Sequence, residues 1–151
     1  MGQHLVFKSD KKLEPLIKHM WEQEKVHLEK FDDLVSKYNV RPTALTPIWK
    51  LAGLTLGIST ALLGKEAAMA CTEAVETVIG EHYNDQLRDL AKTNTSEFLE
   101  LRKTIKAFRD DELEHLETAI EHDSHKAPLY NGLNFVIQAG CKTAIWVAQR
   151  I

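Results

Sequence analysis

Apolar residues recur every three or four positions along most of the chain, which is the spacing of helices that bury one face. The pattern predicts five long helices, over residues 11–38, 47–63, 65–90, 97–121 and 128–147. No stretch alternates apolar and polar residues in the way of a half-buried strand. We therefore expect an all-α fold in a single domain that spans residues 1–151.

Capping and helix-breaking residues define the ends of these segments. Pro15 is tolerated only in the first turn of a helix, so the first long helix begins soon after Asp10, which is a start signal. Pro42 ends this helix, because the residue before a proline avoids the helical conformation. Residues 93–96 form a polar loop with cap residues, and residues 5–7 read as the end of an earlier helix.

Carboxylates and imidazoles replace apolar residues on the inner faces of three predicted helices. Two Glu-x-x-His pairs, Glu24 with His27 and Glu112 with His115, lie on two of these faces, and Glu76 lies on a third. A buried, unpaired carboxylate is costly or takes up a proton, so three of them need shared compensation. Either pair alone is explained as a set of satisfied polar core residues. The full set favours a metal site.

The five residues fit part of the ligand pattern of ferritin-like di-iron bundles, in which two helices each give a Glu and two others each give Glu-x-x-His. Mixed carboxylate and imidazole ligation suits iron or manganese. Because Glu76 precedes Glu112 by 36 residues, the matching Glu of the first half falls ahead of Met1, which leaves five of six ligands. Glu73 is the nearest substitute on its helix. The remaining candidates belong to solvated faces: Glu22, Glu81, Glu114, Glu117 and Glu121.

Residues 47–63 are the most apolar part of the chain, and residues 51–63 carry no charge. A helix needs about 20 such residues to span a bilayer, so this run is too short. Two interpretations stay open: a helix buried in the core, or a helix in a membrane interface with Trp49 and Lys50 at the boundary.

Composition removes several classes of function. The formal net charge of -3 provides no basic field, so we expect no nucleic-acid partner. The two cysteines, Cys71 and Cys141, form no C-x-x-C pair and no disulfide framework, which fits a reducing compartment. A phosphate-binding loop and a hydrolase nucleophile motif are both missing from the sequence.

Several longer motifs surround the candidate ligands: MWEQEK (20–25) with His27, ALLGKE (61–66), AMACT (68–72), HYN (82–84), ELEH (112–115) and QAGC (138–141). With these motifs the sequence resembles the demethoxyubiquinone hydroxylases of coenzyme Q biosynthesis, a mitochondrial di-iron family. The resemblance covers nearly the whole chain. It implies a ferritin-like helical bundle bound peripherally to the matrix side of the inner mitochondrial membrane. It also implies hydroxylation of demethoxyubiquinone by O₂ at two iron ions, with NADH as electron source. Other coenzyme Q biosynthesis proteins, including a lipid-binding partner, are implied as partners.

The resemblance also implies roles for the candidate ligands. Glu24 and Glu112 would bridge the two irons, His27 would bind one iron, and Glu76 and His115 would bind the other.

Four further residues match positions of the family. His82 and Tyr83 match catalytic positions near the di-iron site, for orienting ligands or moving electrons and protons; on the residues alone they are equally well explained as polar residues at a helix edge. Arg150 matches a position linked to NADH, and Trp146 stands where relatives have Tyr.

Family members begin with a helix that contains Asp-His-Ala-Gly-Glu and supplies the first Glu ligand, and we expect this chain to start after that helix. The main hypothesis is therefore an N-terminally shortened quinone hydroxylase. The alternative is a non-catalytic bundle that acts as a membrane-binding or partner-binding scaffold, and metal content separates the two. The apolar helix argues against a soluble iron store.

Overall fold

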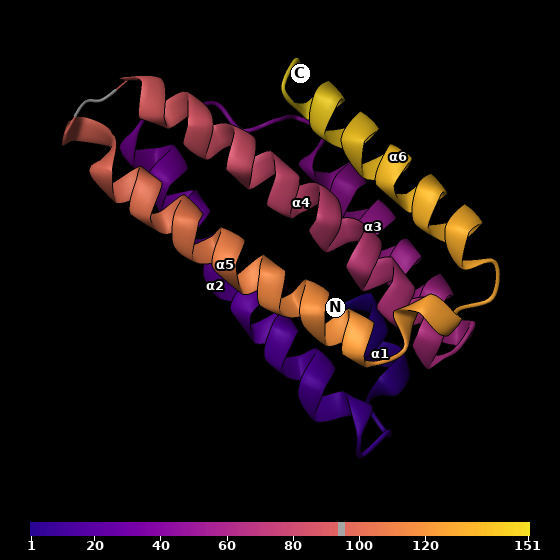
Figure 1. Cartoon of the computed structure of the whole chain (residues 1–151). Helices are drawn as coiled ribbons and strands as arrows, with labels where there is room; N and C mark the ends of the chain where they lie inside the picture. The colour runs from indigo at the N-terminus through magenta and orange to yellow at the C-terminus, as the bar shows by residue number, and fades with distance from the viewer. Residues whose placement is uncertain (94–95) are drawn as a thin grey trace.

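Six α-helices and two short 3-10 turns make up the described part of the chain, which contains no strand (Figure 1). The structure is a computed structural model and describes residues 1–93 and 96–151, except the side chain of residue 97. The helices are α1 (Gly2–Phe7), α2 (Leu13–Lys37), α3 (Thr46–Leu62), α4 (Lys65–Thr93), α5 (Leu99–Glu121) and α6 (Tyr130–Ala148). The 3-10 turns are η1 (Ser96–Phe98) and η2 (Ser124–Lys126). The all-α prediction is confirmed.

The helix ends lie close to the predicted ones, and the largest difference is at α4, which continues to Thr93 instead of ending near residue 90. Asp10 marks the start of α2, because its Oδ1 accepts hydrogen bonds from the backbone N–H groups of Lys12 (2.9 Å) and Leu13 (3.0 Å). Gly64 separates α3 from α4 with a φ of +117°, a conformation that favours glycine. The predicted loop at 93–96 includes residues 94–95, which lie outside the described residues.

Helix α4 is the central element of the fold, since it packs along both α5 and α6 (Figure 1). Helix α5 also contacts α2, so α2, α4 and α5 together surround the positions of the predicted ligands. Helix α1 lies against α3 with almost no space between the two backbones. A Cβ atom at Gly57 would come within 3.2 Å of the Cα atom of Gly2.

The core of α2, α4 and α5 is divided into two apolar clusters. One cluster includes Met20, Met69 and Ala119, and the other includes Tyr83 and Phe108. On α4 and α5 the predicted ligands lie between a residue of the first cluster and a residue of the second. The polar group is therefore held between two apolar layers, which limits its contact with water.

Helix α3 is mostly exposed, and only Thr60 and Ala61 of it are buried. Its large apolar side chains at Ile48, Leu51 and Leu62 are all more than half exposed. The interpretation of this segment as a buried core helix is therefore wrong, because the rest of the described chain does not cover it. Among the described helices, none combines the length and the hydropathy that crossing a bilayer requires.

Candidate metal centre

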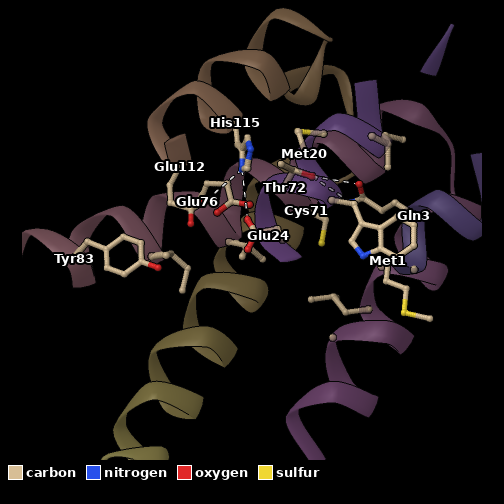
Figure 2. A pocket seen from close by; sticks show the side chains of 18 residues that line it. Met1, Gln3, Met20, Glu24, Cys71, Thr72, Glu76, Tyr83, Glu112 and His115 are labelled. Atoms are coloured by element: carbon tan, nitrogen blue, oxygen red, sulfur yellow. Dashed lines mark hydrogen bonds and ion pairs between the residues drawn. The ribbon is translucent and has the colours of Figure 1, made fainter. Parts of the chain in front are cut away.

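Three helices bring four of the predicted ligands to one place. Glu24 comes from α2, Glu76 from α4, and Glu112 and His115 from α5; each offers a ligand atom within 4.8 Å of the others (Figure 2). The i, i+3 spacing puts Glu112 and His115 on the same face of α5, as the sequence predicted. Their role as ligands stays a proposal.

The fifth predicted ligand, His27, lies directly beside this group. Its Nδ1 atom is 3.3 Å from Oε1 of Glu112 and 3.8 Å from Oε2 of Glu24. Nδ1 of His115 is 3.2 Å from Oε2 of Glu112 and 3.6 Å from Oε1 of Glu24. Glu112 thus lies between the two imidazoles, with one carboxylate oxygen facing each of them.

Two atoms at the centre of this group are buried without a hydrogen-bond partner, Nδ1 of His27 and Oε2 of Glu112. An orphaned buried polar atom costs about 1–3 kcal/mol. A cation between the helices would satisfy both atoms, because imidazole nitrogens and carboxylate oxygens are ligands of iron and manganese. The residues present therefore fit a metal ion.

The Nε2 atoms of His27 and His115, which lie on the side of each ring away from the carboxylates, contact residues outside the candidate metal group. Nε2 of His27 is 2.9 Å from Oδ2 of Asp111, and Nε2 of His115 is 2.9 Å from Oε1 of Gln23. The sequence analysis missed both partners. A signal was present, because each is a polar residue that directly precedes a ligand Glu of its own helix.

The pKa values of the three carboxylates are shifted in opposite directions by burial, by neighbouring carboxylates and by the two histidines. Burial, followed by the charge of Glu112, raises the pKa of Glu76 well above its usual value and that of Glu24 to about 7. The side chain of Glu24 is 47% exposed, so the prediction that this carboxylate is buried on an inner helix face is wrong, because the side chain borders a cavity. Burial alone would raise the pKa of Glu112 too, but His115 and His27 outweigh it and lower the value to about 2.

The same interactions favour a proton on His27. Burial alone would lower its pKa, but the contacts with Glu112 and Asp111 raise it to about 9. The raised pKa values of His27 and Glu76 therefore favour the protonated form of both side chains in the metal-free protein.

A cavity of about 500 Å³ adjoins the group (Figure 2). Its wall includes four of the five predicted ligands, all except His27, together with apolar side chains such as Trp21, Leu56 and Ile79. Helix α3 contributes Gly53, Leu56 and Gly57 to this wall, so the cavity extends from the charged group to the exposed apolar helix. Tyr83 also lines the cavity, and burial raises the pKa of its hydroxyl.

His82 and Tyr83 are adjacent on α4, but they line different cavities. His82 lines a second cavity of about 380 Å³ between α4 and α6, together with Trp146. Burial lowers the pKa of His82, and Nε2 of its ring is 3.2 Å from the amide nitrogen of Gln86. Arg150 places its guanidinium 4.1 Å from the centre of the Trp146 ring. None of His82, Trp146 and Arg150 belongs to the candidate metal group.

Glu73, the alternative ligand, is directed elsewhere. It is buried, and its Oε1 accepts a hydrogen bond of 2.5 Å from the hydroxyl of Tyr130 at the start of α6. Glu73 is not a member of the candidate metal group.

Comparisons with known proteins identify the family of the chain. Residues 1–148 match the sequence model of the family described as "Ubiquinone biosynthesis protein COQ7". The rat protein named "NADPH-dependent 3-demethoxyubiquinone 3-hydroxylase, mitochondrial" is 53% identical over 90% of this chain and 63% of its own length. The Saccharomyces cerevisiae protein named "5-demethoxyubiquinone hydroxylase, mitochondrial" is 51% identical over 92% of this chain and 64% of its own length. The Rhodospirillum rubrum protein named "3-demethoxyubiquinol 3-hydroxylase" is 46% identical over 90% of this chain and 62% of its own length.

The chain therefore spans somewhat less than two thirds of the length of these relatives. The match of the family model covers nearly every residue, including all five predicted ligands. The ferritin-like helical bundle expected from the sequence is the fold of this family. The chain belongs to the family described as ubiquinone biosynthesis protein COQ7.

Proposed function

We propose that the chain forms a di-iron monooxygenase that hydroxylates the ring of demethoxyubiquinone with O₂ in ubiquinone biosynthesis. The observation that carries this proposal is the group of carboxylates and imidazoles in the wall of an apolar cavity. The relatives named above are hydroxylases of demethoxyubiquinone or demethoxyubiquinol by their names. A pair of iron ions, when bound, supplies the activation of O₂.

The positions of the five residues support distinct ligand roles. Glu112 suits a bridging position, because its two oxygens face His27 and His115 separately. Glu24 approaches both imidazoles as well and would be the second bridge. We assign His27 to one ion, and Glu76 with His115 to the other.

The cavity suits the quinone ring and the first part of its apolar tail. Trp21, Leu56 and Ile79 supply apolar surface, and the ligand group lies at one part of the wall. A tail that leaves past Leu56 would reach α3. Tyr83 keeps its proton, since burial raises its pKa, and its hydroxyl is available to donate a hydrogen bond within the cavity.

A nicotinamide dinucleotide is the proposed electron donor, as NADPH is in the name of the rat relative and as the resemblance implied for NADH. The second cavity suits a nicotinamide ring, since Trp146 lines it with an aromatic ring and Arg150 places a cation over one face of that ring. His82 lines this cavity and directly precedes Tyr83, which lines the first. These adjacent residues link the two cavities along α4.

We place the protein peripherally on the matrix side of the inner mitochondrial membrane, with other coenzyme Q biosynthesis proteins, including a lipid-binding one, as partners. The exposed apolar side chains of α3 support binding to a membrane surface. The rat and yeast relatives have "mitochondrial" in their names.

Reconstitution of the chain with Fe²⁺ tests the proposal. The protein is supplied with a short-tailed demethoxyubiquinone, O₂ and either NADH or NADPH, and the product is identified by mass spectrometry. About two irons per chain together with a hydroxylated ring support the enzyme, as a di-iron site requires. One iron or none, without product, supports the non-catalytic scaffold instead.

A further inference from the structure

Each candidate imidazole ligand of α2 and α5 contacts, through Nε2, a polar side chain of the other helix. Asp111 directly precedes Glu112 on α5 and contacts His27 of α2. Gln23 directly precedes Glu24 on α2 and contacts a histidine of α5, His115. Both contacts are 2.9 Å long and involve Nε2, so in both rings Nδ1 is the atom that faces the carboxylates.

The two partners differ in the hydrogen bonds that they allow. A carboxylate only accepts, so Asp111 requires a proton on Nε2 of His27 and leaves the Nδ1 lone pair for a metal. A side-chain amide both accepts and donates, so rotation of the Gln23 amide would allow either tautomer of His115. In addition, a negative partner makes an imidazole a stronger electron donor than a neutral partner does.

We propose that Asp111 is a positioning residue that fixes His27 as a metal ligand and makes the two metal positions unequal. The ion at His27 binds first and more tightly, and the ion at His115 binds second. This inference rests on the proposed metal centre but not on the substrate or on the hydroxylation. A fixed orientation with the Nδ1 lone pair toward the metal is needed at both positions, but only His27 has an acceptor-only partner at Nε2 that enforces this tautomer.

Titration of the full chain with Zn²⁺, with the heat of binding measured by calorimetry, tests the order of binding. Wild type should show two steps, and Asp111→Asn should weaken the tighter step by about 10–100-fold while the weaker step changes little. Asp111→Glu, which keeps an acceptor-only group, should restore much of the loss. Asp110→Asn is the matched control, because it removes the same charge one residue away, where the carboxylate pairs with Lys106 and Arg109.

A second measurement separates positioning from stability. In the zinc-loaded protein, the Nε2 proton of His27 should give a downfield, slowly exchanging NMR signal that is lost in Asp111→Asn and kept in Asp110→Asn. The reverse substitution, Gln23→Glu, should tighten the weaker step. A single binding step in wild type, equal weakening of both steps by Asp111→Asn, or equal effects of Asp110→Asn and Asp111→Asn would overturn the inference.

The outcome also distinguishes this inference from the proposed function. Two unequal metal steps without any hydroxylated product would leave the inference standing and count against the proposed enzyme. Hydroxylation by the wild type, together with a metal titration that Asp111→Asn leaves unchanged, would support the proposed enzyme and overturn the inference. A chain that binds no metal would overturn both.

Discussion

Oε1 of Glu112 on α5 lies 3.3 Å from Nδ1 of His27 on α2, which joins the two Glu-x-x-His pairs of the chain. The other oxygen of Glu112 faces His115 on its own helix at 3.2 Å. This carboxylate is almost fully buried, and its Oε2 lacks a hydrogen-bond partner. One side chain therefore connects the two imidazoles of the proposed metal centre.

Substitution of this central residue should remove the metals altogether. In Glu112→Ala both proposed ions lose their bridge, and we expect metal content to fall from about two ions per chain to near zero. Metal analysis after dialysis against Fe²⁺ or Mn²⁺ measures this. Glu114→Ala is the matched control, because Glu114 is exposed on the same helix. Full metal content in Glu112→Ala would show that Glu112 is not a ligand.

Metal binding should stabilise the protein more as the pH rises. The pKa of His27 is raised from 6.5 to about 9, so its stabilising contribution to the metal-free fold is complete below pH 6.5 and is lost as the pH rises through 9. The pKa of Glu24 is raised from 4.5 to about 7, so ionisation of this carboxyl destabilises the metal-free fold over that range. Both effects lower the stability of the metal-free fold as the pH rises.

In the loaded protein a cation replaces these protons. The difference in Tm between zinc-loaded and metal-free protein should therefore grow from pH 6 to pH 8.5. Differential scanning calorimetry at several pH values measures this Tm difference. Calorimetric titration of the protein with Zn²⁺ in buffers of different ionisation enthalpy gives the number of protons released on binding. A Tm difference that stays constant, with no proton release, would contradict the assignment of these groups to the site.

The helices and the inner positions of the ligands were predictable because both depend on local spacing. A period of 3.6 residues places Glu112 and His115 on one face whatever surrounds them. The convergence of Glu24 and Glu76 on that face could be expected from the cost of burying several carboxylates separately and from the resemblance to a di-iron family. The half-exposed position of Glu24 could not be predicted, because it depends on the cavity beside it.

Features that depend on the contact between two helices were not predictable from the sequence. The pairing of Asp111 with His27 requires the register of α5 against α2, and the cavity at His82 requires the packing of α4 against α6. The sequence could not decide whether α3 is exposed, for another reason. An apolar run has the same composition in a protein core and at a membrane surface, so only the packing decides between them.

The exposed face of α3 should bind lipid. Leu51 is 65% exposed there, and Leu51→Asp should weaken binding to phospholipid vesicles by about tenfold or more, because burial of one leucine is worth about 1.5–3 kcal/mol. Vesicle flotation measures the bound fraction. Leu99→Asp is the control, since Leu99 is 51% exposed on α5. Equal loss in both variants would show that α3 is not the binding face. Leu56 is unsuitable for this test, because it lines the cavity.

Filling the cavity from the side of α3 should reduce hydroxylation without removing the metals. Leu56→Trp adds an indole to the cavity wall, where it would compete with the quinone for apolar space. We expect kcat/KM for a demethoxyubiquinone analogue to fall about tenfold or more, which corresponds to about 1.4 kcal/mol or more of lost transition-state stabilisation. Metal content should stay unchanged, because Leu56 is not among the candidate ligands. Leu51→Trp makes the same type of change on the exposed part of α3 and should leave kcat/KM nearly unaltered. Normal turnover in Leu56→Trp would place the substrate outside this cavity.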